Sequence, residues 1–96
     1  MVPEKLNVLI IGSGGREHAL ASKVAMSPRL GQLFCMPGNA GTASIAKNLD
    51  VDPSDHNAVI AAAKANQIDF TIVGPEAPLC AGIVDRFNDE GLCIFG

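Results

Sequence analysis

The 96-residue sequence predicts an α/β fold built on a small parallel sheet. Short apolar runs alternate with helix-forming segments along the chain, an order typical of parallel strands joined by right-handed crossovers. Loops rich in glycine and proline follow the apolar runs, where strands give way to helices. Apolar residues make up 48% of the sequence and charged residues 18%, which favours one well-buried domain.

The first strand and helix are predicted at Val8–Ile11 and Arg16–Ala25. Four consecutive apolar residues suit a strand that is covered on both faces. Glycines at 12, 14 and 15 allow positive φ angles and let a ligand approach the backbone closely. The free N–H groups and the positive dipole end of the helix then point at the space above the strand. This turn is therefore predicted to bind an anionic or polar ligand.

Two other interpretations of the glycine turn stay open at this point. The dinucleotide pattern G-x-G-x-x-G requires glycine where Glu17 stands, and no acidic residue ends the second strand, which runs into Met36-Pro37. Binding of NAD or FAD is therefore disfavoured. A turn that needs glycine only for packing is the remaining structural alternative.

The second strand is predicted at Leu33–Met36, after the first helix ends before Ser27-Pro28. It leads into a second glycine loop, Pro37–Thr42. The following helix can be capped by Asp52 or Ser54, and Asn66 can close it in the left-handed region. Its apolar face consists of Val59, Ile60 and Ala63.

The third strand is predicted at Asp69–Val73 and is followed by the loop Gly74–Pro78. Pro78 suits the first position of the next helix, and Gly91 suits its end. The last strand is predicted at Leu92–Phe95. The apolar face of the last helix consists of Leu79, Ile83 and Phe87.

Three loops should therefore meet at the carboxyl edge of the sheet, namely Gly12–His18, Pro37–Thr42 and Gly74–Leu79. Ligands of open parallel sheets bind beyond the carboxyl ends of the strands. The edge formed by these loops is the predicted ligand site.

Composition argues against several classes of function. The formal net charge is −3, and the four Phe are the only aromatic residues, so the chain lacks the basic and stacking surface of a nucleic-acid-binding protein. No apolar run is long enough to span a membrane, and no leader sequence is recognisable, so we expect a soluble, cytoplasmic protein. Cys35, Cys80 and Cys93 lack metal-site spacing, and we expect buried thiols in a reducing compartment.

The three loops also carry a family resemblance. The segments GSGGREHAL, PGNAGTA and VGPEAPLCAG, in this order and at these separations, closely resemble the amino-terminal domain of phosphoribosylamine–glycine ligase, also called glycinamide ribonucleotide synthetase. The resemblance covers essentially the whole chain. It implies a Rossmann-like three-layer sandwich that precedes an ATP-grasp unit. It also implies that the full enzyme uses ATP and Mg²⁺ to join glycine to 5-phosphoribosylamine in purine (IMP) biosynthesis, giving glycinamide ribonucleotide.

The resemblance further implies how this domain takes part. Residues 1–96 would form the substrate-binding pre-ATP-grasp domain, with no catalytic residue, metal or cofactor of its own and no ligase activity alone. The ATP-grasp and carboxyl-terminal domains would lie outside this chain and would be its partners. Glu76 would accept hydrogen bonds from the ribose hydroxyls, and Cys80 departs from the small aliphatic residue expected there. The implied substrate-binding residues are Gly12, Gly14, Gly15, Arg16, Gly38, Asn39, Gly74, Pro75 and Glu76.

Structural explanations remain for several of these polar residues. Arg16 can be a solvated charge at the helix end, and Glu17 can stabilise the helix start rather than contact a ligand. His18 can serve the pocket, or it can pack or cap. His56 is predicted to lie on the solvated surface. The alternative function is a stand-alone ribose-phosphate or nucleotide-binding module without catalysis.

Overall fold

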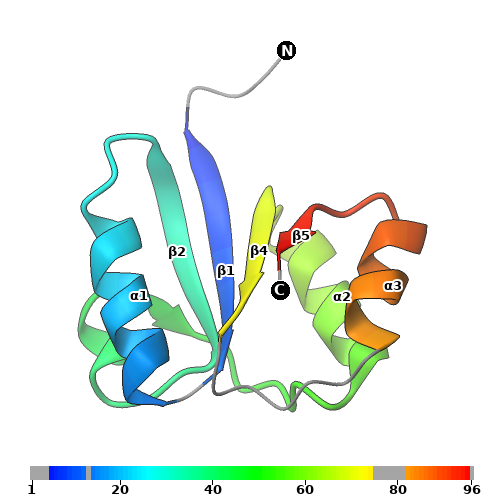
Figure 1. Cartoon of the computed structure of the whole chain (residues 1–96), viewed down its shortest axis with the longest axis horizontal. Coiled ribbons are helices and arrows are strands. Elements are labelled where there is room, and N and C mark those ends of the chain that lie inside the picture. The colour runs from blue at the N-terminus through cyan, green and yellow to red at the C-terminus, as the bar shows by residue number, and fades with distance from the viewer. Residues whose placement is uncertain (1–4, 13, 75–81, 96) are drawn as a thin grey trace.

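The computed structural model describes residues 5–12, 14–74 and 82–95. These residues form a five-stranded parallel sheet in the order β3-β2-β1-β4-β5. Helix α1 covers one face of the sheet, and helices α2 and α3 cover the other (Figure 1). The predicted α/β three-layer architecture is thereby confirmed. The elements are β1 Leu6–Gly12, α1 Gly15–Ala25, β2 Leu30–Pro37, the 3₁₀ turn η1 Thr42–Ser44, β3 Lys47–Asn48, α2 His56–Ala65, β4 Phe70–Val73, α3 Gly82–Asp89 and β5 Ile94–Phe95.

Strand β1 lies at the centre of the sheet, and its side chains divide between two cores. Leu9 and Ile11 face α2 and α3, whereas Val8 and Ile10 face α1. This alternation is the period-two pattern of a strand, and it shows why the run has no polar position. Ala21 of α1 is buried in the core on that side of the sheet.

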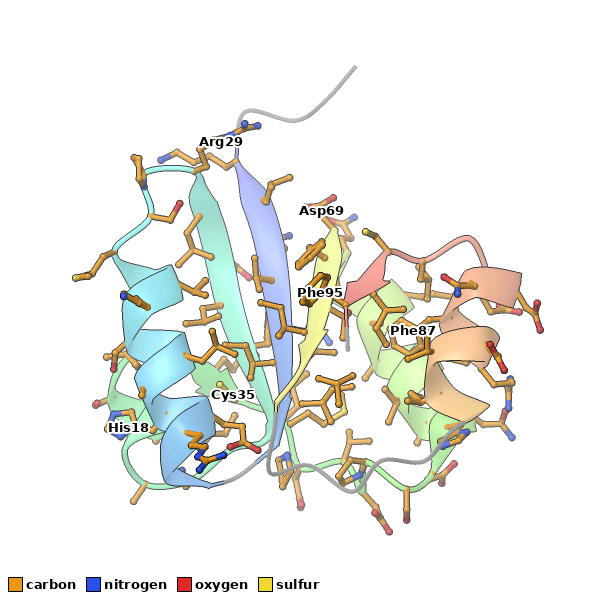
Figure 2. All side chains as sticks on the ribbon, viewed as in Figure 1. His18, Arg29, Cys35, Asp69, Phe87 and Phe95 are labelled. Carbon is orange, nitrogen blue, oxygen red and sulfur yellow. The ribbon has the colours of Figure 1, made fainter. Side chains whose placement is uncertain are left out.

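Helix α3 is held by Phe87, the largest fully buried side chain among the described residues. Figure 2 shows this ring projecting from α3 toward α2 and the sheet. The helix ends in a Schellman motif, because the Leu92 amide donates to the Phe87 carbonyl (2.9 Å) and the Gly91 amide to the Asn88 carbonyl (3.1 Å). Gly91 has φ +71°, which confirms its predicted role at the helix end. The predicted start of this helix at Pro78 and Leu79 lies outside the described residues.

Helix α2 is capped by Asp55 rather than by Asp52 or Ser54, and it ends at the expected residue, Asn66, but without the expected left-handed conformation there. Asp55 caps the helix by accepting a hydrogen bond from the Ala58 amide (3.2 Å), whereas Asp52 accepts hydrogen bonds from the Ser54 amide and hydroxyl in the preceding turn. These hydrogen bonds lower the pKa of the Asp52 carboxyl. At the other end the left-handed residue is Gln67 (φ +54°), not Asn66, whose side-chain amide donates to the helix carbonyl of Ala62.

Strand β3 was not predicted, because two residues are too short for a periodic signal. The last strand is also shorter than expected and begins at Ile94, so that Cys93 precedes it and is exposed. The prediction of a buried thiol is therefore wrong for Cys93, and Cys80 lies outside the described residues. It is confirmed for Cys35, where burial raises the pKa of the thiol and a hydrogen bond with Thr42 opposes part of that rise.

His56 also differs from its predicted place on the solvated surface. The residue is half-buried, and within the described residues its Nε2 atom is buried without a hydrogen-bond partner. Its ring lies beside Gly82, the first residue of α3, and thereby fills the space between two helix starts. Among the helices that the structure describes, none is long and apolar enough to cross a membrane.

Candidate functional site

The candidate site lies where the strand order changes direction. From β1 the sheet continues to β2 and β3 on one side and to β4 and β5 on the other. In open α/β sheets the crevice beyond the strand ends at such a switch point is the usual ligand site. The carboxyl ends of β1, β2 and β4 meet at the lower edge of Figure 1. His18 lies toward this end, whereas Arg29 and Asp69 lie at the opposite end of the sheet (Figure 2).

Backbone hydrogen bonds bring the predicted glycines together at this edge. The Gly38 amide donates to the Gly12 carbonyl (3.2 Å), and the Gly74 amide donates to the Ile11 carbonyl (2.8 Å). Ile11 is paired with Val73, so Gly12 and Gly74 are the next residues of two adjacent strands. The structure thus joins residues from all three predicted loops.

The glycines of the first turn have different conformations. Gly12 has φ +142°, a region that L-residues rarely adopt. Gly14 is extended (φ −85°, ψ 178°) and Gly15 begins α1, so Gly12 is the residue of this turn that uses the conformational freedom of glycine among those that the structure describes. Gly14 is the N-cap residue and provides no side-chain acceptor, while the space where a Cβ of Gly15 would lie is open. The start of α1 therefore keeps the features of an anion-binding site.

The second loop is held by a hydrogen-bond network around Thr42, which is fully buried. Asn39 accepts a bond from the Thr42 amide (2.9 Å) through Oδ1, and its Nδ2 donates to the Gly14 carbonyl (3.2 Å). The Thr42 hydroxyl donates to Asn48 Oδ1 (2.8 Å), and Asn48 Nδ2 donates to the Asn39 carbonyl (2.8 Å). Asn39 thus fixes its own loop and ties it to the first turn, a role that the sequence did not predict.

Two further glycines allow close packing in this region. Gly38 has φ +77°, and a Cβ there would overlap the side-chain amide of Asn48 and lie 2.8 Å from Thr42 Oγ1. A Cβ at Gly41 would lie 2.6 Å from two atoms of the His18 ring. His18 therefore packs against the second loop, in agreement with the packing alternative considered for it.

Glu17 has an unexpected position. Its side chain is fully buried, and its carboxylate covers the ends of β1 and β4. A Cβ added at Gly12 would lie 2.6 Å from Glu17 Cδ, and one added at Gly74 would lie 2.7 Å from the same atom. These positions continue the side-chain rows of Ile10 and Ile72, which face α1. Glycine ends both rows, and the glutamate occupies the space that two side chains would otherwise fill.

Among the described residues, neither oxygen of the Glu17 carboxylate has a hydrogen-bond partner. An ion pair between described residues joins Lys64 and Glu90, whose side chains are both exposed, and it does not involve Glu17. Glu17 stands at the third position of α1, where a capping box would return a bond to the N-cap amide, but this bond is not formed. The helix dipole favours a negative charge here. A buried carboxylate without a partner still costs several kcal/mol, so its presence requires an explanation.

Of the remaining predicted site residues, the structure describes Arg16 and Gly74 but not Pro75 and Glu76. Arg16 is exposed on the first turn of α1 and takes part in an interaction, so it is not a free charge. Gly74 closes β4 as described above. Pro75 and Glu76 lie outside the described residues, and their roles stay predictions.

Other features of the surface contribute little to this site. An open groove is lined by Gln32–Phe34 and Ala43–Lys47, and its lining contains none of the glycines at the strand ends. In the described ranges, no three His, Cys, Asp or Glu side chains gather into a group that could hold a metal ion.

Comparison with known proteins adds the following findings. The family described as "Phosphoribosylglycinamide synthetase, N domain" matches residues 6–96. The chain is 60% identical over 92 residues to the phosphoribosylamine–glycine ligase of Rhodopirellula baltica, covering 96% of this chain and 21% of the relative. It is 57% identical over 95 residues to the ligase of Pseudomonas aeruginosa and 54% identical over 91 residues to that of Brucella melitensis, covering in each case 95% of this chain and 21% of the relative. The chain thus spans about a fifth of the length of these relatives.

Proposed function

Because the chain belongs to the phosphoribosylglycinamide synthetase N-domain family, we propose that it serves as the amino-terminal domain of a phosphoribosylamine–glycine ligase. Such an enzyme joins glycine to 5-phosphoribosylamine at the expense of ATP, in the purine pathway of the cytoplasm. We propose that this domain binds the ribose-phosphate part of phosphoribosylamine and of the product, glycinamide ribonucleotide. ATP, Mg²⁺ and glycine would be bound by the part of the relatives that this chain does not span.

The observation that supports this role is the meeting of Gly12, Gly38 and Gly74, one residue from each predicted loop, at the switch point of the sheet. The start of α1 offers amides without a side-chain cap, next to the positive end of a helix of 11 residues. An anionic phosphate is stabilised at such a helix end by hydrogen bonds and by the dipole. The loop held by Asn39 and Thr42 is attached to the same turn and is already ordered by its own hydrogen bonds. An ordered site reduces the entropy lost when a small ligand binds.

The first test joins this chain to the missing part of a relative. We expect the 96-residue chain alone to form no ADP from ATP, glycine and phosphoribosylamine. We expect a chimera, in which this chain replaces the matching amino-terminal fifth of the Rhodopirellula baltica ligase, to have ligase activity. The remaining part of that ligase without an amino-terminal domain is the control and should be inactive. ADP formation by the isolated chain, or a folded chimera without activity, would contradict the proposal.

The second test concerns Glu76 in the same chimera. If its carboxylate accepts hydrogen bonds from the ribose hydroxyls, Glu76→Ala removes charge-assisted bonds worth about 1.5–3 kcal/mol, roughly a 10- to 150-fold effect. The loss should appear in KM for phosphoribosylamine, while KM for ATP and for glycine stays nearly unchanged. Steady-state kinetics with each substrate varied in turn would measure this. Glu90→Ala, which removes an exposed carboxylate at the end of α3, is the matched control. Unaltered phosphoribosylamine kinetics in the Glu76 variant would remove this residue from the site.

A further inference from the structure

From the position of Glu17 we infer that its carboxylate binds hydrogen-bond donors of the ribose ring, either its hydroxyl groups or the nitrogen attached to C1. The inference rests on the proposed function, because it assumes that a ribose phosphate binds at this edge of the sheet. It adds an acceptor that the resemblance did not suggest. It also assigns an orientation to the ligand.

The first argument is the unsatisfied state of the carboxylate. Glu17 has no exposed surface, and none of the described residues donates a hydrogen bond to either of its oxygens. A buried carboxylate needs donors, because burial removes the hydrogen bonds that water supplies. A ligand with O–H or N–H groups would supply them. An ionised carboxylate is an acceptor only, so it selects donors and repels anions.

The second argument is the space provided for this side chain. Glycine at both 12 and 74 leaves room for the carboxylate directly over the two strand ends at the switch point. Glu17 also stands where the dinucleotide pattern has its third glycine. In a dinucleotide site that glycine lets the helix pack closely against the strand. This chain thus has glycine at the ends of both β1 and β4, whereas a dinucleotide site has glycine at the helix position that Glu17 occupies. The result is a buried acidic group at the strand ends, next to the switch point where ligands of this fold bind.

The third argument concerns the orientation of the ligand. A phosphate placed against Glu17 would bring two anions together in a region of low dielectric, which is unfavourable. The phosphate is expected instead at the amides of Gly14 and Gly15, at the start of α1. The ribose ring would then extend from this end of the helix toward the ends of β1 and β4. Because Glu17 is covered in the ligand-free fold, binding must include a rearrangement at this edge.

A Glu17 that serves only the fold and a Glu17 that serves the ligand predict opposite effects of its replacement on stability. If Glu17 serves only the fold, its replacement lowers the melting temperature and leaves ligand affinity unchanged. If it serves the ligand, the ligand-free protein carries a buried carboxyl group without a hydrogen-bond partner, and its replacement by an uncharged residue of the same length stabilises the fold. Glu17→Gln and Glu17→Met keep the length of the side chain and remove the charge. We expect Tm to rise by about 4–8 °C in the absence of ligand.

The binding experiment uses the 96-residue chain in NMR titrations with ribose 5-phosphate, glycinamide ribonucleotide and inorganic phosphate. We expect shifts at the amides of Gly14, Gly15 and Asn39. The affinity for a ribose phosphate should fall about tenfold in Glu17→Gln, which keeps a neutral acceptor, and about 10- to 150-fold in Glu17→Met. The affinity for inorganic phosphate should not fall, because phosphate offers no ribose donor. Glu90→Gln is the matched control and should leave every affinity unchanged.

The ratio of the affinities for ribose 5-phosphate and inorganic phosphate decides the test. A selective loss for both ribose compounds supports the inference through the hydroxyl groups, and a loss for glycinamide ribonucleotide alone supports it through the nitrogen on C1. An unchanged ratio for both compounds, whatever the change in Tm, overturns the inference and leaves the proposed function standing. If the wild-type chain binds no ribose phosphate at these amides, the proposed function is wrong and the inference falls with it.

Discussion

Gly74→Ala is expected to destabilise the protein by about 1–3 kcal/mol, the usual range for overpacking a filled space. The added Cβ would lie 2.7 Å from Glu17 Cδ, so the buried side chain must move. Gly74 has no positive φ, and its backbone alone does not require glycine. Removing the side chain of Glu17 in the same molecule should therefore recover most of the loss. Urea denaturation of both single variants and of the double variant Glu17→Ala/Gly74→Ala would measure the coupling free energy.

Gly12 provides the internal control for this cycle. A Cβ at Gly12 would also overlap the Glu17 side chain, but the residue in addition has φ +142°, which L-residues adopt only with strain. Gly12→Ala should destabilise the protein by about 3 kcal/mol, and Glu17→Ala should recover only part of this loss. Equal recovery of stability by Glu17→Ala at both positions would show that backbone strain does not contribute to the loss in Gly12→Ala. Absence of coupling at Gly74 would show that the Glu17 side chain does not fill the space over the ends of β1 and β4.

Phe87→Ala is expected to destabilise the protein by about 3–5 kcal/mol. The ring is fully buried in the core between the sheet and helices α2 and α3, where its removal leaves a cavity. Small domains have only about 5–15 kcal/mol of stability in total, so this variant should lose a large share of it. The midpoint of urea unfolding, compared at equal slope, measures the change.

Phe95→Ala is the matched substitution at an exposed position, because the relative accessibility of that residue is 67%. Its effect should stay within about 0.5 kcal/mol. Similar losses for both phenylalanines would mean that the core between α3 and the sheet is not packed as described.

The fold was predictable where the signal is local. The apolar run of β1, the helix that follows it and the glycine at the end of α3 each depend on a few adjacent residues. The ends of α2 were less predictable, because Asp52, Ser54 and Asp55 are all chemically able to cap a helix. Strand β3 depends on its pairing with β2, which no periodicity of its own records.

The site was predictable in outline but not in its chemistry. Glycine loops at strand ends indicated the edge of the sheet, and the three segments indicated the family. The roles of Asn39 and Glu17 could not be predicted, because they depend on contacts between loops that are distant in sequence. The available signal for Glu17 was its place three residues after Gly14, where the dinucleotide pattern has glycine. That signal argued against NAD and FAD as ligands, but it did not indicate that the side chain lies over the ends of β1 and β4.

The register of the central strand also bears on the order in which the chain folds. The β1–α1–β2 unit is made from neighbouring segments, whereas the pairing of β1 with β4 joins Val8 to Phe70 across most of the chain. We expect such a non-local parallel pairing to form after the local unit, because a long loop must close before its contacts are gained. Gly12 and Gly74 come together only in this step, and Glu17 can be enclosed only then. A nascent or partly folded chain would therefore contain the glycine turn and α1 but not yet the site.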